Sequence, residues 1–344
     1  MTTKTKNILI ISGISIVVLA IAILGTIYDL QISKALADLQ PGQYHSKNLF
    51  AIIGETIGEN ILYVLLVSAL CILFFYLLHN PLNKKWLNIS VQIGLCLVSF
   101  VVCFYCLHKT LDYIATHTLF GLDKFITSTL GLIVIILASI IVTILSFLLF
   151  SKINNENLKT LWKWALLVLI LAAASNLIVQ TAKHIFDRTR FRAMVFVGDA
   201  EFQYYDYWFK FNQNKFTSIS IYAEDFFKSF PSGHTCAAAS SFFLILLPLF
   251  LPQTNNKKWK TIFWISASVY TFLVALSRII AGAHFFMDVF VGGDVCIILT
   301  LIAYFSVKFV QAKENSLKEK TQTSIVDEIK ENVKKRKTQT NKSK

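Results

Sequence analysis

Long apolar runs, separated by short polar connections, make up most of this chain. A helix needs about 20 apolar residues to cross a hydrocarbon layer about 30 Å thick. Eight runs come near that length, with approximate limits at residues 8–28, 60–78, 89–107, 130–150, 161–181, 235–251, 262–280 and 286–309. The pattern predicts an all-α fold, a polytopic membrane helix bundle with about eight transmembrane helices.

Two of the boundaries between these runs are informative. Only residues 281–285 separate the last two runs, which predicts a tight turn at the membrane surface. The first run follows Lys4 and Lys6, as in a signal peptide, but its apolar stretch is too long for one and no clear cleavage site follows it. We interpret it as an uncleaved anchor.

Basic residues concentrate in alternate connections. They are Lys84 and Lys85, then Lys152 and Lys159, then Lys257, Lys258 and Lys260, and finally Lys334, Lys335, Arg336 and Lys337 in the tail. Because cytoplasmic connections are enriched in Lys and Arg, this pattern predicts cytoplasmic N- and C-termini. The connection at 182–233 and the turn at 281–285 then lie on the extracytoplasmic face.

The long extracytoplasmic connection carries a cluster of aromatic residues. Its members are Tyr204, Tyr205, Tyr207, Trp208, Phe209 and Phe211. Aromatic side chains of this kind suit the lipid headgroup region. They suit the packing of a small extramembrane lobe equally well, and both interpretations stay open.

Composition agrees with a membrane protein. Of 344 residues, 55% are hydrophobic and 15% are charged, whereas charged residues make up about a quarter of a soluble domain. The net charge of +13 comes mainly from short connections and the tail, so it reports topology and predicts no nucleic-acid partner. All six cysteines lie within apolar runs, which argues against disulfides and thiolate metal sites.

Three short stretches carry the candidate chemistry. The first runs from Lys183 to Arg190, directly after the fifth apolar run. The second runs from Phe230 to Thr235 and opens the sixth run. The third begins with Ser277 and Arg278 and continues to residue 288. A single cation at a helix end is often only an anchor that reaches the interface, but three such stretches on one face form a constellation.

His284 and Asp288 are four residues apart at the start of an apolar helix. Side chains at this spacing lie on one helix face, so we expect the carboxylate to hold the imidazole. Such a contact fixes the tautomer and prepares the ring as a nucleophile or base. A hydrogen-bonded pair that only satisfies two buried polar groups remains the alternative.

Ser232, Gly233 and His234 stand where a helix begins, with free backbone N–H groups that suit an anion. Gly233 allows close approach of a ligand, and His234 is available as an acid or base. Plain helix capping by Ser232 is the alternative interpretation.

Lys183, Arg190 and Arg278 would repel one another strongly unless a polyanion lay between them. Phosphate is the natural guest, because Arg offers paired donors to its oxygens and Lys a point charge. Three further cations could bind headgroups or face solvent: Arg188, Arg192 and Lys228.

The three stretches resemble the signature of the type 2 phosphatidic acid phosphatase family, relatives of the vanadium haloperoxidases. The Pro-Ser-Gly-His and Ser-Arg-x5-His-x3-Asp patterns match residue for residue, in the order and at the helix ends expected of the family. The Lys-x6-Arg-Pro pattern departs once, because Phe191 stands where the family usually has Pro.

The resemblance implies a two-step hydrolysis. His284 would attack phosphorus, Asp288 would orient it, and His234 would protonate the leaving group. The phosphoryl oxygens would be held by Lys183, Arg190, Ser232, Gly233 and Arg278. No cofactor is implied, and no metal, because the cations supply the charge and we see no cluster of metal ligands in the sequence.

The resemblance also implies a division of the chain. Additional N-terminal transmembrane helices occupy 1–130, a phosphatase core of the six-helix type occupies 131–311, and a cytoplasmic basic tail occupies 312–344. The expected partners are membrane lipids and a lipid phosphate, with undecaprenyl pyrophosphate, phosphatidylglycerophosphate and phosphatidate all open. A bacterial cytoplasmic membrane is the expected location. A lipid phosphotransferase, a vanadate-dependent peroxidase and a non-enzymatic lipid transporter are the alternatives.

Overall fold

The computed structural model describes residues 3–117, 122–211 and 224–342. This described part of the chain is helical and contains no strand, which confirms the all-α prediction. The N-terminal half contains α1 (Thr3–Leu36), α2 (Leu49–Ile57), α3 (Asn60–His79), α4 (Lys85–Thr116), α5 (Leu122–Thr127) and α6 (Thr129–Phe150). It is followed by α7 (Asn155–Phe186), α8 (Phe191–Val197), η2 (Glu224–Phe227), α9 (Gly233–Ala239), η3 (Ser240–Leu249), η4 (Pro252–Thr254), α10 (Lys257–Ile280) and α11 (Phe286–Lys342), where η denotes a 3-10 helix.

Seven helical segments among the described residues are long and apolar enough to span a membrane: Ser15–Leu36, Leu49–His79, Lys85–Thr116, Thr129–Phe150, Asn155–Val197, Lys257–Ile280 and Phe286–Glu319. A shorter apolar helix, Gly233–Leu249, corresponds to the sixth predicted run. The chain is therefore a multi-pass membrane protein, and the tight turn predicted between α10 and α11 is confirmed.

Polar caps set where several of these helices begin. Asn48, Ser128, Asn154 and Asn256 each accept a backbone N–H from the first turn of the helix that follows. Such caps satisfy donors that an apolar helix cannot satisfy by itself. At the other end of α7, Asp187 adopts a left-handed conformation with φ of 40°, which ends the helix just beyond Lys183.

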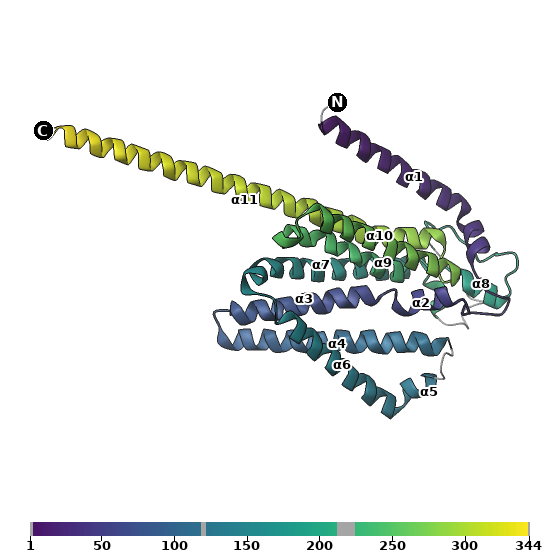
Figure 1. Cartoon of the computed structure of the whole chain (residues 1–344). Helices are drawn as coiled ribbons and strands as arrows, with labels where there is room; N and C mark the ends of the chain where they lie inside the picture. Colours follow the sequence, from purple (N-terminus) through teal and green to yellow (C-terminus); the bar gives the residue numbers. More distant parts are fainter. Residues whose placement is uncertain (1–2, 118–121, 212–223, 343–344) are drawn as a thin grey trace. The chain divides into compact units, whose positions relative to one another are not determined.

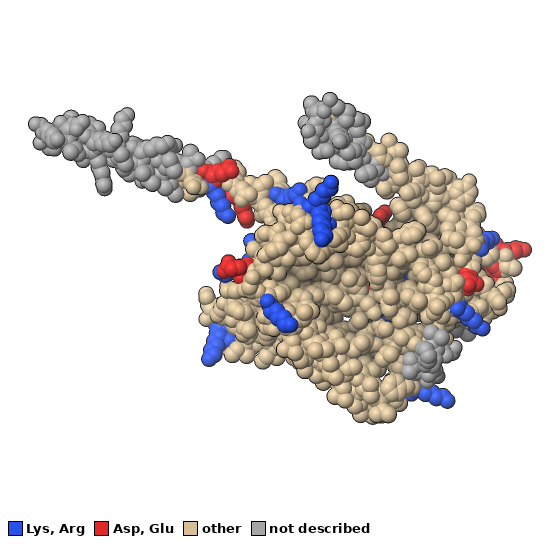
Figure 2. Space-filling model, viewed as in Figure 1, with Lys and Arg blue, Asp and Glu red and all other residues tan. Residues whose placement is uncertain are grey.

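The chain forms two compact units, Met1–Thr300 and Leu301–Lys344, and every site described below lies in the first. Within it, α3 packs against α7 and α4, α4 packs against α6, and α10 packs against α2, α9 and η3 (Figure 1). The visible surface of the helical layers around α3, α4 and α6 carries few charged side chains (Figure 2). Such a surface is suited to contact with lipid.

The predicted aromatic cluster divides between the two interpretations. Tyr205 packs its ring 5.3 Å from that of Phe285, and Trp208 Nε1 donates to Thr26 Oγ1 of α1 at 3.0 Å. Phe211, in contrast, is 64% exposed. Part of the cluster therefore packs against the rest of the protein, and the contact of its exposed part with headgroups stays a prediction.

Close packing of α2 against α10 places the start of the α2–α3 segment near the end of α10. A Cβ on Gly54 would lie 1.9 Å from Ser277 Oγ and 2.3 Å from Ser277 Cβ, so only glycine fits between these helices. The same approach brings Glu55, the next residue of α2, to Arg278 of α10.

We expect Gly54→Ala to lower the midpoint of thermal unfolding in detergent. Overpacking against Ser277 costs about 1–3 kcal/mol, which exceeds the gain of about 1 kcal/mol from replacing a helical glycine. Gly94 of α4 is the matched control, because a Cβ there meets nothing within 4 Å, so Gly94→Ala should leave the midpoint unchanged or raised. Equal midpoints for the two variants, read by intrinsic fluorescence, would contradict the close packing.

Candidate active site

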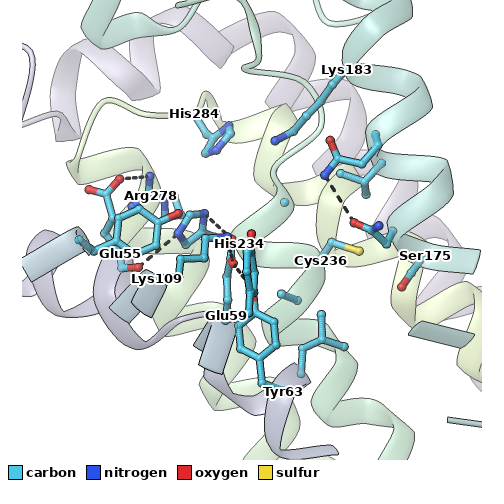
Figure 3. Close-up of a pocket in the computed structure, with 18 of the residues that line it drawn as sticks. Glu55, Glu59, Tyr63, Lys109, Ser175, Lys183, His234, Cys236, Arg278 and His284 are labelled. Carbon is cyan, nitrogen blue, oxygen red and sulfur yellow. Dashed lines mark hydrogen bonds and ion pairs between the residues drawn. The ribbon is translucent and has the colours of Figure 1, made fainter. Parts of the chain in front are cut away.

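A cavity of about 770 Å3 opens among α3, α4, α7 and α9. Six of the residues predicted from the sequence line it: Lys183, Arg190, Gly233, His234, Arg278 and His284. Figure 3 shows His284 and Lys183 on one side of this cavity, with His234 and then Glu59 and Tyr63 beyond them. Segments that lie far apart in the sequence therefore meet at one place, where several helices begin or end.

Lys183 lies in the last turn of α7 and reaches toward the start of α9. A Cβ on Gly233 would lie only 3.3 Å from Lys183 Nζ, so glycine leaves the ammonium group room beside the backbone. Within the described residues, Lys183 makes no hydrogen bond to a protein acceptor. Its charge is thus available to a ligand in the cavity.

Arg278 and Arg190 each have one carboxylate partner and unused donors. Arg278 Nη2 donates to Glu55 Oε1 at 2.9 Å, while its Nε and Nη1 are buried without an acceptor in the described part of the chain. Arg190 Nη2 donates to Asp225 Oδ1 at 2.8 Å, and its Nε has no acceptor there either. Buried donors without partners are costly, so these groups favour an anion with several oxygens.

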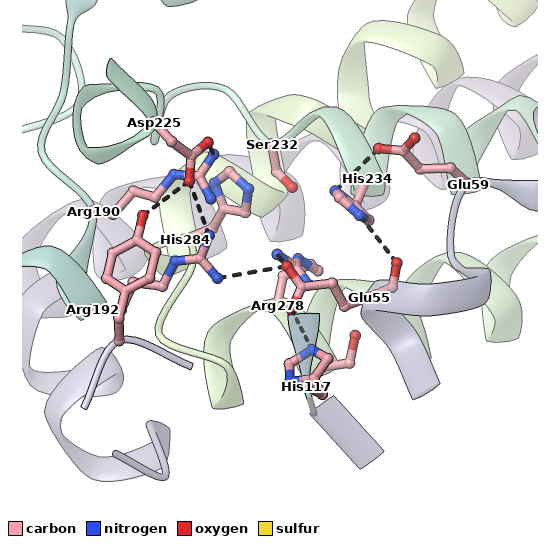
Figure 4. A network of polar contacts seen from close by, with 12 residues as sticks. Glu55, Glu59, His117, Arg190, Arg192, Asp225, Ser232, His234, Arg278 and His284 are labelled. Atoms are coloured by element: carbon pink, nitrogen blue, oxygen red, sulfur yellow. Dashed lines mark hydrogen bonds and ion pairs between the residues drawn. The ribbon is translucent and has the colours of Figure 1, made fainter. Parts of the chain in front are cut away.

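Asp225 bridges two arginines at the rim of the site (Figure 4). Its Oδ1 accepts from Arg190, and its Oδ2 accepts from Arg192 at 3.1 Å and from Tyr44 at 2.9 Å. Partial burial acts to raise the pKa of Asp225, but Arg190 and Arg192 outweigh it and lower the pKa to about 2. Asp225 is therefore ionised and holds both guanidinium groups in place.

Ser232 is placed as a helix cap. Its side chain accepts from Thr235 N, is fully buried and does not line the cavity. The capping alternative therefore describes its side chain, and its predicted contact with phosphate remains a prediction.

The predicted hydrogen bond between His284 and Asp288 is wrong. Asp288 Oδ2 lies 3.9 Å from His284 Nδ1, and the carbonyl oxygen of Ser229 lies 2.6 Å from Nδ1 instead. The prediction failed because α11 begins at Phe286, so His284 precedes the helix and the four-residue spacing no longer stacks the two side chains. Asp288 instead accepts from the backbone N–H of Phe285 and caps this turn.

Asp288 acts on His284 through the surrounding loop. Ser229 Oγ donates to Asp288 Oδ2, while the carbonyl of Ser229 accepts from His284. Burial and the positive charges of Arg190, Arg278 and Lys183 hold the pKa of His284 well below its usual range. The ring is therefore neutral, and with its proton on Nδ1 the lone pair of Nε2 is free.

Arg188, which the sequence left open as a solvated or headgroup-binding cation, is only 2% exposed. Its Nη2 donates to Asp29 of α1 at 2.6 Å, its Nη1 donates to Asp288, and its Nε donates to the carbonyl of Asp206 at 3.0 Å. The guanidinium also lies 4.1 Å from the centre of the Phe285 ring. Arg188 therefore joins α1, the connection after α7 and the turn before α11.

Arg192 and Phe191 are also buried parts of this assembly. Arg192 pairs with Glu55 at 3.5 Å and with Asp225, so it does not face solvent. Phe191 is the first residue of α8, a position that suits Pro in other helices, and its ring stacks on Phe202 at 5.2 Å. Packing thus takes the place of the rigidity that Pro would give after Arg190.

His234 has an acceptor at each ring nitrogen. Glu59 Oε1 lies 3.1 Å from Nδ1, and the carbonyl oxygen of Glu55 lies 3.2 Å from Nε2. Glu59 also accepts from Lys109 of α4 and, at 3.2 Å, from Tyr63 of α3. The N-terminal helices therefore supply charged groups directly to the cavity.

Sequence reasoning missed four acidic groups that pair with the basic residues of this site. They are Asp29, Glu55, Glu59 and Asp225. A signal was present for three of them, because Asp29, Glu55 and Glu59 lie inside or beside apolar runs, where an ionisable residue usually has a function. The sequence alone could not show which cation each one meets.

A group of potential metal ligands lies next to the cavity, contrary to our interpretation of the sequence. Ligand atoms of His45, Glu55 and His117 lie within 4.8 Å of one another. Both oxygens of Glu55 already have protein partners, with Arg278 and Arg192 on Oε1 and His117 on Oε2. A metal at this cluster would therefore compete with these partners for the oxygens of Glu55.

Comparison with known proteins gives a family match over part of the chain and no structural match. Residues 162–312 match the model of the PAP2 superfamily. This region contains all eight predicted site residues and ends within α11. No solved structure matches the chain.

We expect Arg188→Met to lower the yield of folded protein and its midpoint of thermal unfolding. Loss of the guanidinium leaves two carboxylates buried without compensation, at a cost of about 3–5 kcal/mol. Arg188→Lys should not restore stability, since one ammonium cannot reach three acceptors in the same fork geometry. The control is Lys152→Met, which removes an exposed cation. Wild-type unfolding of Arg188→Met would show that the ion pairs stabilise nothing.

Proposed function

We propose that the protein hydrolyses a lipid phosphate in the cavity between α3, α7 and α9, because residues 162–312 match the model of the PAP2 superfamily, whose members are generally phosphatases. One observation carries the proposal. His234 and His284 line one cavity together with Lys183, Arg190 and Arg278, and buried guanidinium donors there lack acceptors in the described part of the chain. A phosphoryl group offers the oxygens that these donors require.

In the first step, the neutral His284 attacks phosphorus through Nε2. A P–N bond forms and the P–O bond to the leaving group breaks, while His234 donates a proton to the departing oxygen. Lys183, Arg190 and Arg278 stabilise the charge on the equatorial oxygens of the transition state. The backbone at Gly233 gives the phosphoryl group room to approach.

In the second step, water cleaves the phosphohistidine. The water oxygen bonds to phosphorus, the P–N electron pair returns to Nε2 of His284, and the proton of water passes to His234. Inorganic phosphate leaves, and both histidines recover their starting protonation states. Asp288 contributes by holding the Ser229 loop, whose carbonyl accepts from His284.

The proposed substrates are lipids that carry a phosphate or diphosphate: undecaprenyl pyrophosphate, phosphatidylglycerophosphate and phosphatidate. The cavity supports an amphiphile, because apolar side chains such as Leu62, Leu66 and Leu169 line it beyond the charged groups. We place the site on the extracytoplasmic face of a cell membrane, with both termini cytoplasmic, from the distribution of basic residues. Phosphate release from a panel of these lipids separates a hydrolase from a lipid phosphotransferase, which yields a new phosphorylated lipid, and from a transporter, which yields neither.

We expect His284→Ala to reduce phosphate release by at least about a thousandfold and His234→Ala by about 10²–10⁴-fold. The first variant loses the nucleophile and the second loses the acid. His184→Ala is the matched control, because His184 follows Lys183 directly but is exposed and does not line the cavity. The measurement is phosphate release from a lipid phosphate in detergent. Undiminished turnover in both cavity variants would overturn the assignment.

We expect EDTA to change phosphate release by less than about twofold, because arginine and lysine stabilise the transition-state charge. The assay compares protein treated with EDTA before and after addition of Mg²⁺ or Zn²⁺. Strong inhibition that metal reverses would contradict the proposal. Weaker reactivation by the metal in His45→Gln than in the wild-type protein would then locate the metal at the cluster with Glu55 and His117.

A further inference from the structure

The two histidines of the cavity have opposite surroundings. His284 is buried among cations, which keeps the ring neutral, and its Nδ1 donates a hydrogen bond to the carbonyl of Ser229. His234 instead lies between two acceptors, the carboxylate of Glu59 and the backbone carbonyl of Glu55. Both acceptors receive a hydrogen bond only when each ring nitrogen carries a proton, which is the imidazolium form. The direct contacts of His234 thus favour a second proton on the ring, whereas the surroundings of His284 oppose one.

The break between α2 and α3 creates this pair of acceptors. Helix α2 ends at Ile57 and α3 starts at Asn60, so the last carbonyl groups of α2 have no partner within the helix. Tyr270 Oη donates to the carbonyl of Ile57 at 2.8 Å, and His234 takes the carbonyl of Glu55. Glu59 lies in the break itself, which turns its side chain toward His234.

Glu59 is held in a fixed orientation by two further donors. Lys109 and Tyr63 both donate to Oε2, which leaves Oε1 to His234. The side chain of Glu59 is only 13% exposed, and the positive charge of Lys109 keeps its carboxylate ionised. Burial opposes a positive charge on His234, and Arg278 and Lys109 add to that opposition, whereas Glu59 and Glu55 favour the charge. The carboxylate of Glu59 makes the direct contact among these groups.

We propose that Glu59 is a positioning residue that orients His234 and stabilises its protonated form for donation to the leaving oxygen. The proposal rests on the function proposed above and adds a residue from outside the region that matches the superfamily. As the P–O bond breaks, its electron pair goes to the leaving oxygen. Nε2 of His234 turns its hydrogen bond from the carbonyl of Glu55 to this oxygen and transfers its proton to it. Figure 3 shows Glu59 on the far side of His234 from His284, where it supports the acid without approaching the phosphoryl group.

The chemistry of the leaving group reveals this role. An alkoxide is a poor leaving group and needs a proton, whereas a nitrophenolate leaves without one. Loss of a general acid, worth about 10²–10⁴-fold, therefore slows alkyl phosphates and spares aryl phosphates. A purely structural role for the ion pair of Glu59 with Lys109 would slow both substrates equally. The proposal thus assigns the effect of Glu59 to phosphate esters of lipid alcohols.

The experiment measures kcat/KM of the full-length protein in detergent on two substrates that carry the same alkyl chain. One is an alkyl phosphate and the other is a nitrophenyl phosphate. For Glu59→Gln, we expect a loss of about a hundredfold on the alkyl phosphate and less than about threefold on the aryl phosphate. His234→Gln should show the same selectivity, since it removes the acid itself. Glu59→Asp should recover part of the loss.

Two further variants control for charge and folding. Asp112→Asn removes a carboxylate from the same cavity without touching either histidine, and we expect similar small changes on both substrates. The double variant Glu59→Gln with Lys109→Met removes the buried pair together, so no unpaired charge is left to impair folding. It should show the selectivity of Glu59→Gln.

Equal losses on the two substrates in both the single and the double variant would overturn the proposal while leaving the phosphatase function intact. Wild-type kinetics in Glu59→Gln would overturn it as well. If the wild-type protein released phosphate from neither substrate, the proposed function would fail, and the role of Glu59 with it.

Discussion

The ion pairs of Arg188 with Asp29 and Asp288 are the interaction on which the site depends. Three segments far apart in the sequence meet at this guanidinium group: α1, the connection that follows α7, and the turn before α11. Asp29 also accepts from the backbone N–H of Met287, and Asp288 accepts from Ser229. The carbonyl of Ser229 accepts from His284. The orientation of the proposed nucleophile therefore depends on the ion pairs of Arg188, which hold the residues that contact His284.

The arginines on the cavity side of the site also depend on counter-charges. Guanidinium groups with little exposure need counter-charges, and Arg190, Arg192 and Arg278 obtain them from Asp225 and Glu55. Each carboxylate neutralises part of the charge and leaves other N–H donors unused. The site is therefore organised before a ligand enters, and it keeps donors for one. Preorganised donors of this kind need no rearrangement when charge develops on a phosphoryl group.

The sequence predicted the membrane helices well because bilayer thickness imposes a length that apolar runs must reach. It also brought the right stretches together, because Lys183, His234 and His284 each lie at a helix end on one face. Contacts that depend on the exact start of a helix were harder to predict. The pairing of His284 with Asp288 failed because α11 begins two residues later than the spacing requires.

The N-terminal helices were the other part that the sequence could not explain. Their runs are almost wholly apolar, and the partners of Glu55, Glu59 and Lys109 lie elsewhere in the chain. Only the packed helices show that α2, α3 and α4 supply both acids and a cation to the cavity. These helices therefore complete the surroundings of His234, although they lie outside the part of the chain that matches the superfamily.

The central claim is that a phosphoryl group is transferred to His284, and the direct test is to locate the covalent phosphate. The wild-type protein is mixed with a lipid phosphate labelled at phosphorus, and the reaction is stopped in alkali, which preserves phosphohistidine. The labelled peptide is then mapped by mass spectrometry. The account predicts the label on His284, and a label on any other residue would contradict it.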